Sequence, residues 1–241
     1  MELADEAVVY LDDDLLVFDK PPGLPVHATL DPERDHLIAA AGRLLLRRDE
    51  AVGELGLGHR LDVGTSGLIV LGRRPEVTAR LAALFADRAV RKVYVALTER
   101  SDPLPEGVLE VRNHLAANKD RKGVPVVAVR SGGDRAWTTL QVLQSSPRAV
   151  LWRAELHTGR RHQIRAHLTG LGMPLIGDLD YDTRIPASRP MLHAAQLSLP
   201  HPVTAAPLAF SALVPRDFLA IAERYDLDVD AVDALCLENP L

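Results

Sequence analysis

Residues 58–67 read GHRLDVGTSG, and the apolar run LIVL (68–71) follows them directly. A run this short and this rich in branched residues is typical of a buried strand. Glycines at both ends of the preceding loop permit sharp turns and close backbone approach. We expect this loop to hold Asp62 at the mouth of a cleft, as a nucleophile or a general base. The alternative is an ordinary surface loop in which Arg60 and Asp62 are merely solvated.

The composition describes a globular chain. It has 241 residues, of which 47% are hydrophobic and 25% charged, so we expect one compact domain or two closely joined halves. No apolar window is long enough for a membrane span, and the first residues lack the pattern of a signal peptide. The one cysteine, Cys236, excludes an intrachain disulfide. These features predict a cytoplasmic protein with no membrane partner.

Charge is distributed unevenly along the chain. Between Val111 and Gly170 eleven Lys and Arg residues face three acidic ones, a net charge of +8, whereas the whole chain carries −5 and the rest therefore −13. A basic segment on an acidic body indicates a surface that meets an anionic partner such as phosphate. Arginine-rich composition alone is the alternative, but it does not explain the clustering.

Patterns outside the central loop predict further elements. They are a hairpin with strands at 7–11 and 15–18, an extended proline-rich segment at 20–27, helices at 35–48, at 75–85 and from 216, and strands at 91–97, 137–143 and 149–156. We expect the acidic hairpin turn, residues 12–14, simply to be solvated. We expect Phe85 to be a core residue, and residues 113–124 to form a basic loop.

A second dense motif, HTGRRHQIRAHL, begins at His157. Its residue types predict a helix capped by Thr158 and ended by one of the glycines at 170 and 172. Arg161 and Arg165 would then be neighbours of like charge on that helix, an arrangement that calls for a carboxylate or phosphate between them.

We do not expect the histidines of this motif to form a metal site. His157, His162 and His167 are spaced by five, so they do not share a helix face as ligands at i and i+4 do. No HExxH pattern and no cysteine pair accompanies them, and no phosphate-cradling glycine loop occurs in the chain. We expect neither a metal nor a cofactor.

Together these motifs resemble the RluA family of RNA pseudouridine synthases. The resemblance spans nearly the whole chain and is carried, in the family's order, by KPPGLPVH from Lys20, HRLDVGTSGL from His59, RKVYVAL from Arg91, HTGRRHQIRAHL from His157, and PLIGDLDY with LHAAQLSLPHP from Pro174 onward. It implies an isomerase that breaks the bond from ribose to the base nitrogen of a uridine in RNA and remakes it to carbon, without metal or cofactor.

The resemblance also assigns roles to residues. Asp62 matches the catalytic aspartate, which either attacks the anomeric carbon or removes a ribose proton; both routes stay open. Tyr94 matches the tyrosine that packs on the target base. Arg165 matches the basic residue that holds the aspartate, with Arg160 as the alternative. Arg60 matches the residue that fills the gap left by a flipped base.

We expect the neighbouring motif residues to bind the RNA. This substrate-binding group is His59, Arg60, Thr65, Lys92, Arg160, Arg161, His162 and Gln163. The implied fold is α+β, with a mixed, mainly antiparallel central sheet, flanking helices and two halves around an active-site cleft. We expect a single catalytic domain over residues 1–241 with no separate N-terminal RNA-binding domain, acting as a monomer on a stem-loop of ribosomal or transfer RNA.

Two other classes of function remain open. A non-catalytic RNA-binding module would keep the basic segment but would not need Asp62 or Tyr94. A hydrolase would use Asp62 with His59, but no second catalytic carboxylate motif accompanies them.

Overall fold

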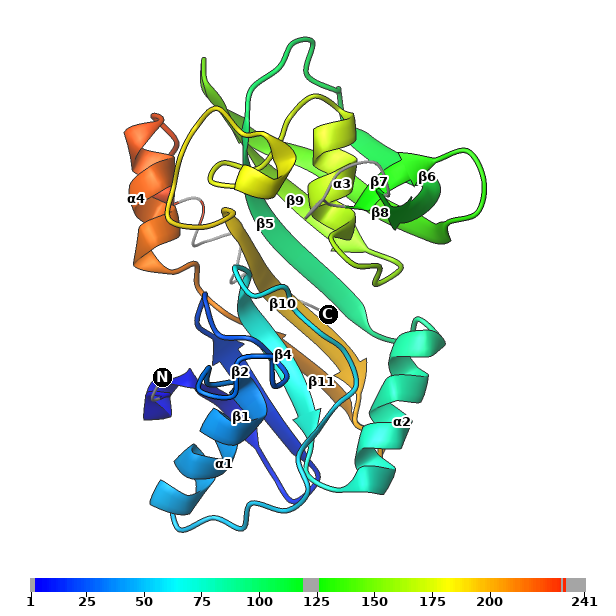
Figure 1. Cartoon of the computed structure of the whole chain (residues 1–241), viewed down its shortest axis with the longest axis vertical. Helices are drawn as coiled ribbons and strands as arrows, with labels where there is room; N and C mark the ends of the chain where they lie inside the picture. The colour runs from blue at the N-terminus through cyan, green and yellow to red at the C-terminus, as the bar shows by residue number, and fades with distance from the viewer. Residues whose placement is uncertain (1–2, 119–125, 231, 233–241) are drawn as a thin grey trace.

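The computed structural model describes residues 3–118, 126–230 and 232 (Figure 1). Within these ranges the helices are α1 (Leu37–Arg47), α2 (Pro75–Ala86), α3 (Gln163–Gly170) and α4 (Arg216–Arg224), with 3-10 turns at Asp5–Ala7 and Leu179–Tyr181. The strands are β1 (Val8–Leu11), β2 (Leu15–Lys20), β3 (Gly56–Leu57), β4 (Ser66–Gly72), β5 (Arg91–Glu99), β6 (Val108–Ala117), β7 (Val126–Val129), β8 (Asp134–Ser145), β9 (Ala149–Leu156), β10 (Leu192–Pro200) and β11 (Pro207–Ser211). None of these helices is long and apolar enough to span a bilayer.

All the described strands belong to one sheet. Its order is β1-β2-β4-β10-β5-β9-β8-β6-β7, with β3 added to β4 and β11 added to β10. Among the pairings of these strands only that of β4 with β10 is parallel. The predicted α+β class with a mixed, mainly antiparallel sheet is therefore confirmed.

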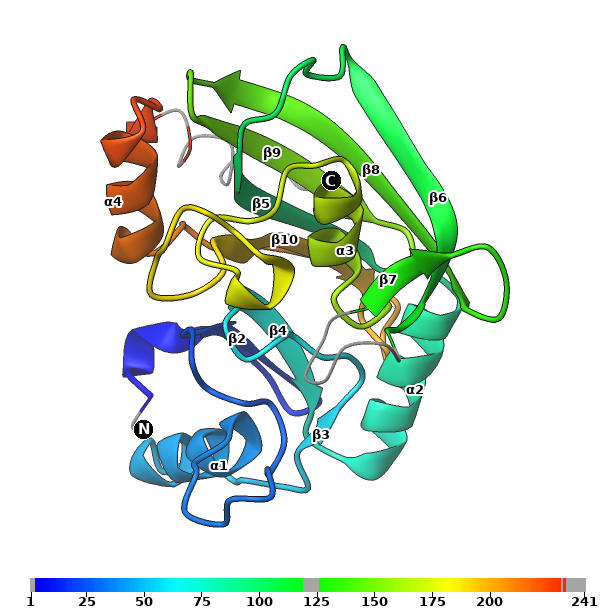
Figure 2. The same cartoon turned by 45° about the horizontal axis from the view of Figure 1, so that its top comes forward.

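Helices cover both faces of the sheet. On one face, α1 and α3 bury their apolar side chains in the same core as Phe18, Tyr94 and Trp152. On the other face, α2 packs on β2 and β4, and α4 packs on β5 and β9. Strands β1 to β4 with α1 and α2 form one half of the molecule, β5 to β9 with α3 form the other, and β10 runs between them (Figures 1 and 2). This arrangement places the central loop, 58–65, at the junction of the halves.

Gly67 is required where the two halves meet. Its φ is +106°, and a Cβ at this position would lie 2.3 Å from the carbonyl oxygen of Ala194. Residue 67 pairs with residue 194 in the parallel ladder between β4 and β10. Only glycine lets these two backbones approach so closely, directly after the loop that carries Asp62.

One predicted loop is wrong. Residues 113–117 belong to β6, which pairs with β8 from Val108 to Leu115 and with β7 from His114 to Ala117. Pairing with strands distant in sequence overrides the weak local preference of these polar residues. Residues 119–124 of the predicted loop lie outside the described residues.

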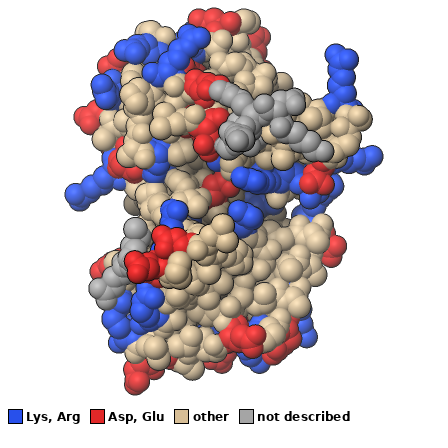
Figure 3. Space-filling model, viewed as in Figure 1, with Lys and Arg blue, Asp and Glu red and all other residues tan. Residues whose placement is uncertain are grey.

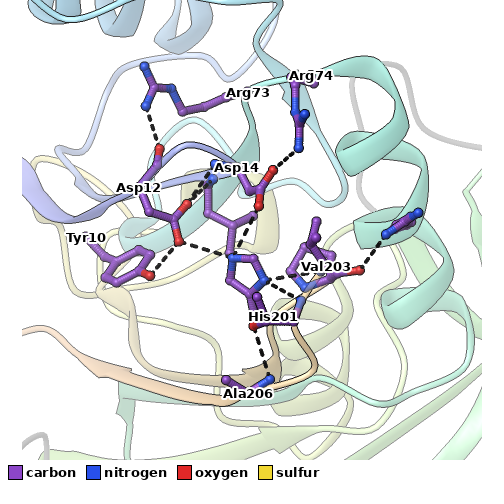
Figure 4. Close-up of polar contacts among 12 residues, drawn as sticks. Tyr10, Asp12, Asp14, Arg73, Arg74, His201, Val203 and Ala206 are labelled. Atoms are coloured by element: carbon purple, nitrogen blue, oxygen red, sulfur yellow. Dashed lines mark hydrogen bonds and ion pairs between the residues drawn. The ribbon is translucent and has the colours of Figure 1, made fainter.

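The acidic turn between β1 and β2 is also different from the prediction, because it is a polar cluster and not merely solvated (Figure 4). Asp12 accepts hydrogen bonds from the Tyr10 hydroxyl and from two backbone N–H groups of its own turn, and Asp14 pairs with Arg74. His201 is buried; its Nδ1 accepts two backbone N–H groups, so its Nε2 donates to Asp12 at 3.1 Å. The cluster thereby ties the first hairpin to the β10–β11 turn.

This cluster gives a stability prediction. Asp12→Ala removes the acceptor of several hydrogen bonds and leaves His201 Nε2 buried without one. We expect the free energy of unfolding to fall by about 1–3 kcal/mol, measured by urea denaturation. Asp13→Ala is the matched control, since Asp13 is exposed in the same turn, and it should change the value by less than about 0.5 kcal/mol. Equal effects of the two variants would contradict the structural role of the cluster.

Candidate active site

A pocket of about 380 Å³ lies between the two halves. Its walls come from the central loop and the end of α2 on one side, and from β5 and residues 156–165 on the other. All the residues predicted for the site line it: Asp62, Tyr94, Arg165, His59, Arg60, Thr65, Lys92, Arg160, Arg161, His162 and Gln163. The fold therefore brings together side chains from three separate motifs, although their roles stay predictions.

Asp62 sits in a turn that is held from several directions. Its carbonyl oxygen accepts the backbone N–H of Thr65 at 3.0 Å, which closes the turn. The next carbonyl, that of Val63, accepts the N–H of Gly23 at 2.8 Å, and the buried Arg189 donates to the carbonyl of Gly64 at 3.1 Å. A carboxylate on a turn so restrained has a defined position, as a nucleophile or base needs.

Lys20 also contacts the turn that carries Asp62. Its side chain is fully buried, and Nζ donates to the carbonyl oxygens of Pro21, Leu24 and Val63. Burial, together with the nearby charge of Arg189, lowers the pKa of Lys20 to about 7. In the sequence, Lys20 is only the first residue of a motif. Its side chain points into the protein because of the register of β2, and the motif does not reveal that register.

Arg165 is the cation that faces Asp62. Nη1 lies 3.4 Å from Asp62 Oδ2, across a separation of 103 residues. The rest of the guanidinium forms two hydrogen bonds with the buried Asp178, at 2.6 and 2.7 Å, and one with Asp180 at 2.7 Å. Arg160, the alternative partner, instead donates to the Arg135 carbonyl. Of the two arginines considered, the structure pairs Arg165 with Asp62.

The helix that carries Arg165 begins later than predicted. Thr158 does not cap it, and Arg161 precedes it, so Arg161 and Arg165 do not share a helix face. Residue 162 takes a left-handed φ of 53° just before α3. The buried Gln163 explains this turn, because its side chain bonds to the Thr158 hydroxyl, to the Arg160 N–H and to β8. The helix ends at Gly170, one of the two glycines predicted to end it, and Gly172 follows with a left-handed φ of 77°.

His162 lies close to the same carboxylate. Its Nε2 is 3.9 Å from Asp62 Oδ1, and its ring meets the edge of Tyr181. Burial lowers the pKa of His162, while the charge of Asp62 opposes the change. The imidazole of His162 is therefore a second polar group beside the Asp62 carboxylate, in addition to Arg165.

Tyr94 forms part of an apolar floor. It points from β5 into the pocket, is 7% exposed, and lies among Leu156, Ile164 and Leu192. Burial, and then the charge of Asp62, raises the pKa of Tyr94 above its ordinary value. The phenol is thus neutral at physiological pH and presents a largely apolar surface of a kind on which a nucleobase stacks.

His59 and Phe85 form a stacked pair at the opposite wall. Their ring centroids are 4.3 Å apart and nearly parallel. Nε2 of His59 accepts the backbone N–H of Val70 at 3.0 Å, and burial lowers the pKa of His59 to about 3. His59 is therefore neutral and anchored to β4. Phe85 was predicted to be a core residue only, but it also lines the pocket. The end of α2 lies at the pocket because of tertiary packing, which the helical spacing of apolar residues does not reveal.

The pocket is strongly cationic. Among the described residues, one carboxylate, Asp62, and six basic side chains line it: Arg60, Arg88, Lys92, Arg160, Arg161 and Arg165. Figure 3 shows Lys and Arg gathered along the hollow that crosses the middle of the molecule. Arg88 was not predicted to be a site residue, because it follows α2 and belongs to none of the motifs recognised in the sequence. Such a surface attracts a polyanion.

Lys92 differs from the other cations of the pocket. It is only 8% exposed, and within the described ranges Nζ has no hydrogen bond or ion pair, only the Phe85 ring at 5.7 Å. Burial lowers the pKa of Lys92 to about 8. A buried ammonium without a counter-charge is suited to an anionic ligand.

As for metals, the described residues hold no group of three or more His, Cys, Asp or Glu that could bind an ion.

The chain is similar to known RNA pseudouridine synthases over most of its length. The profile of the RNA pseudouridylate synthase family matches residues 14–169, which include Asp62, Tyr94 and Arg165. An uncharacterized RNA pseudouridine synthase of Chlorobaculum parvum is 34% identical, over 92% of this chain and 76% of that protein. The ribosomal large subunit pseudouridine synthase D of Pseudomonas aeruginosa is 33% identical, over 88% and 69% of the two chains.

Solved structures share the fold. Human RNA pseudouridylate synthase domain containing 4 superposes with a TM-score of 0.74 at 28% identity, covering 92% of this chain and 94% of the human one. Human RNA pseudouridylate synthase domain containing 1 gives 0.67 at 23% identity, over 95% and 99%. The architecture described above is thus the one that these two proteins have.

Proposed function

Because the chain belongs to the RluA family of RNA pseudouridine synthases, isomerases that convert uridine to pseudouridine in RNA, we propose that it modifies a uridine of large-subunit ribosomal RNA. Several relatives at 31–34% identity carry the name ribosomal large subunit pseudouridine synthase D. That name supports ribosomal over transfer RNA as the substrate. We further propose that the chain is a single catalytic domain that acts as a cytoplasmic monomer.

One observation carries the proposal: the Asp62 carboxylate is held beside Arg165 at the mouth of a cationic pocket whose floor is Tyr94. Uridine within a stem must leave the base stack to reach such a pocket, at a cost of a few kcal/mol, so a loop uridine is favoured. We infer that Arg60 occupies the gap that the base leaves, which its exposure at the rim of the pocket supports.

In the reaction the bond between ribose C1′ and base N1 breaks, and a bond between C1′ and C5 forms. Asp62 either attacks C1′ or removes a ribose proton, and the freed uracil turns over the Tyr94 ring before reattachment. N1 takes up a proton and the hydrogen of C5 leaves to solvent, so atoms and charge balance. The cations around Asp62 hold the phosphates on either side of the target nucleotide.

The experiment that tests the substrate is tritium release from RNA labelled at C5 of uridine. Unmodified transcripts of large-subunit ribosomal RNA and of transfer RNAs are incubated separately with the full chain. Release from the ribosomal transcript and none from transfer RNA supports the proposal. Release from transfer RNA alone overturns the choice of substrate but not the reaction.

Lys92 gives a pH-dependent prediction. Because its pKa is lowered to about 8, Lys92 is charged below that pH and loses its charge above it. RNA affinity should therefore fall as the pH rises through about 8. Lys92→Met should weaken binding roughly tenfold at pH 7, the value of one charge-assisted contact, and should flatten the pH dependence between about 7 and 9. Filter binding of the ribosomal transcript measures both effects; a variant with the wild-type pH curve would contradict the role of Lys92.

A further inference from the structure

Two side chains from neighbouring strands and one from the residue that follows β9 form a stack beside the pocket. Trp137 of β8 lies between His157, with ring centroids 3.9 Å apart, and Arg112 of β6, whose guanidinium carbon is 4.1 Å from the indole centroid. Residues 112 and 137 are direct cross-strand partners, and the His157 N–H donates to the Trp137 carbonyl. The stack therefore follows one row of the sheet, on the face opposite α3.

The two ends of this stack differ. His157 lines the active-site pocket. At the other end the Arg112 side chain is 59% exposed, and β7, the next strand, pairs with β6 only from His114 onward. Since neighbouring strands lie about 4.8 Å apart, the stack reaches roughly 10 Å from the pocket edge to an open side.

Arg112 is suited to stacking by its flat guanidinium group more than to attracting phosphate by its charge. Its Nη2 lies 2.5 Å from Glu110 Oε2, a residue on the same face of β6, so the charge already has a partner and the guanidinium is held in place. The guanidinium carbon lies over the Trp137 ring, and the 59% exposure of the side chain leaves it accessible to a flat group from solvent. Guanidinium planes stack on nucleobases in this way.

Charge next to the stack suits RNA. Arg135 pairs with His114, two residues along the strands from the pair of Arg112 and Trp137, and the Arg160 Nε donates to the Arg135 carbonyl. Arg160 also lines the pocket. Two exposed arginines thus lie near the stack and the pocket, where they suit the backbone of a bound strand.

We propose that the Arg112–Trp137–His157 stack is a second RNA contact, on which a nucleotide flanking the target uridine stacks its base against the outer face of the Arg112 guanidinium. This inference rests on the proposed function, and it adds a contact outside the pocket. Packing alone does not account for Trp137, because its buried Nε1 has no acceptor among the described residues, and an apolar aromatic would avoid that cost.

The test compares the wild type with Arg112→Ala, Arg112→Lys and Arg148→Ala on one RNA, the unmodified large-subunit ribosomal transcript labelled with tritium at C5 of uridine. Arg148 is the matched control: it also lies over an aromatic ring, that of Tyr225, but at the opposite end of the β8–β9 hairpin. Filter binding gives Kd, and tritium release gives KM and kcat.

Arg112→Ala should raise Kd and KM about tenfold, the effect of one lost base stack, and leave kcat within about twofold. Arg112→Lys should remain within about twofold of Arg112→Ala, because an ammonium has no plane. Arg148→Ala should match the wild type.

Two results would overturn the stacking proposal. One is a Kd for Arg112→Ala equal to that of the wild type, which removes the contact. The other is full recovery by Arg112→Lys, which makes it a point charge on phosphate. A wild-type chain that binds the transcript but releases no tritium contradicts the proposed function instead, while the comparison of Kd values still decides the stacking.

Discussion

Asp62→Asn is expected to lower kcat for tritium release at least about 10³-fold, because the amide can neither attack C1′ nor take a ribose proton. The substitution keeps the shape of the side chain and an acceptor for Arg165. Of the described residues that line the pocket, Asp62 alone is a carboxylate, so its removal should leave RNA affinity unchanged or raise it. Single-turnover tritium release and filter binding measure the two quantities on the same RNA.

Asp180→Asn is the matched control for this result. Asp180 also binds Arg165, at 2.7 Å, but its side chain is 53% exposed and it does not line the pocket. We expect its kcat to stay within about threefold of the wild type. If the two variants lost activity equally, the loss would come from the disturbed Arg165 cluster and not from chemistry at Asp62.

Arg165→Met should have the second largest effect, on stability and activity together. It leaves the Asp178 carboxylate, only 1% exposed, without its bidentate partner, so we expect the free energy of unfolding to fall by about 3–5 kcal/mol. Asp62 loses its positioning cation at the same time, and kcat should fall about a hundredfold. Urea denaturation and tritium release at saturating RNA measure the two losses.

The double variant Arg165→Met with Asp178→Asn separates these two effects. Removing both charges of a buried pair is close to neutral for stability, so most of the lost stability should return. Activity should not return, since Asp62 still lacks its partner. Recovery of both would mean that Arg165 acts only through the fold.

The sequence predicted the strands around the central loop and the residues of the pocket well. The apolar run that follows the central loop forms β4, a strand whose residues are all buried. A continuous run of branched apolar residues is typical of a strand that is covered on both faces. Tyr94 was placed on its correct face by the period of two in β5. Recognition of the pairing between Asp62 and Arg165 came from the motif resemblance; no local pattern links residues 103 positions apart.

Tertiary contacts explain what the sequence missed. Thr158 looked like a helix cap, but the Gln163 side chain binds it and keeps residues 158–162 in a turn. The acidic turn around Asp12 looked solvated because its partner, His201, is 189 residues away. Phe85 and Arg88 entered the pocket only because α2 ends against the central loop. In each case the deciding contact lies outside the window that a local pattern covers.

The most direct test of the central claim is the chemical identity of the product. Large-subunit ribosomal RNA transcribed without modification is incubated with the full chain, digested to nucleosides and separated by chromatography. We expect pseudouridine in an amount equal to the tritium released from C5, with no free uracil. Free uracil and an abasic site would instead show a hydrolase, and would contradict the assignment of Asp62 to isomerisation.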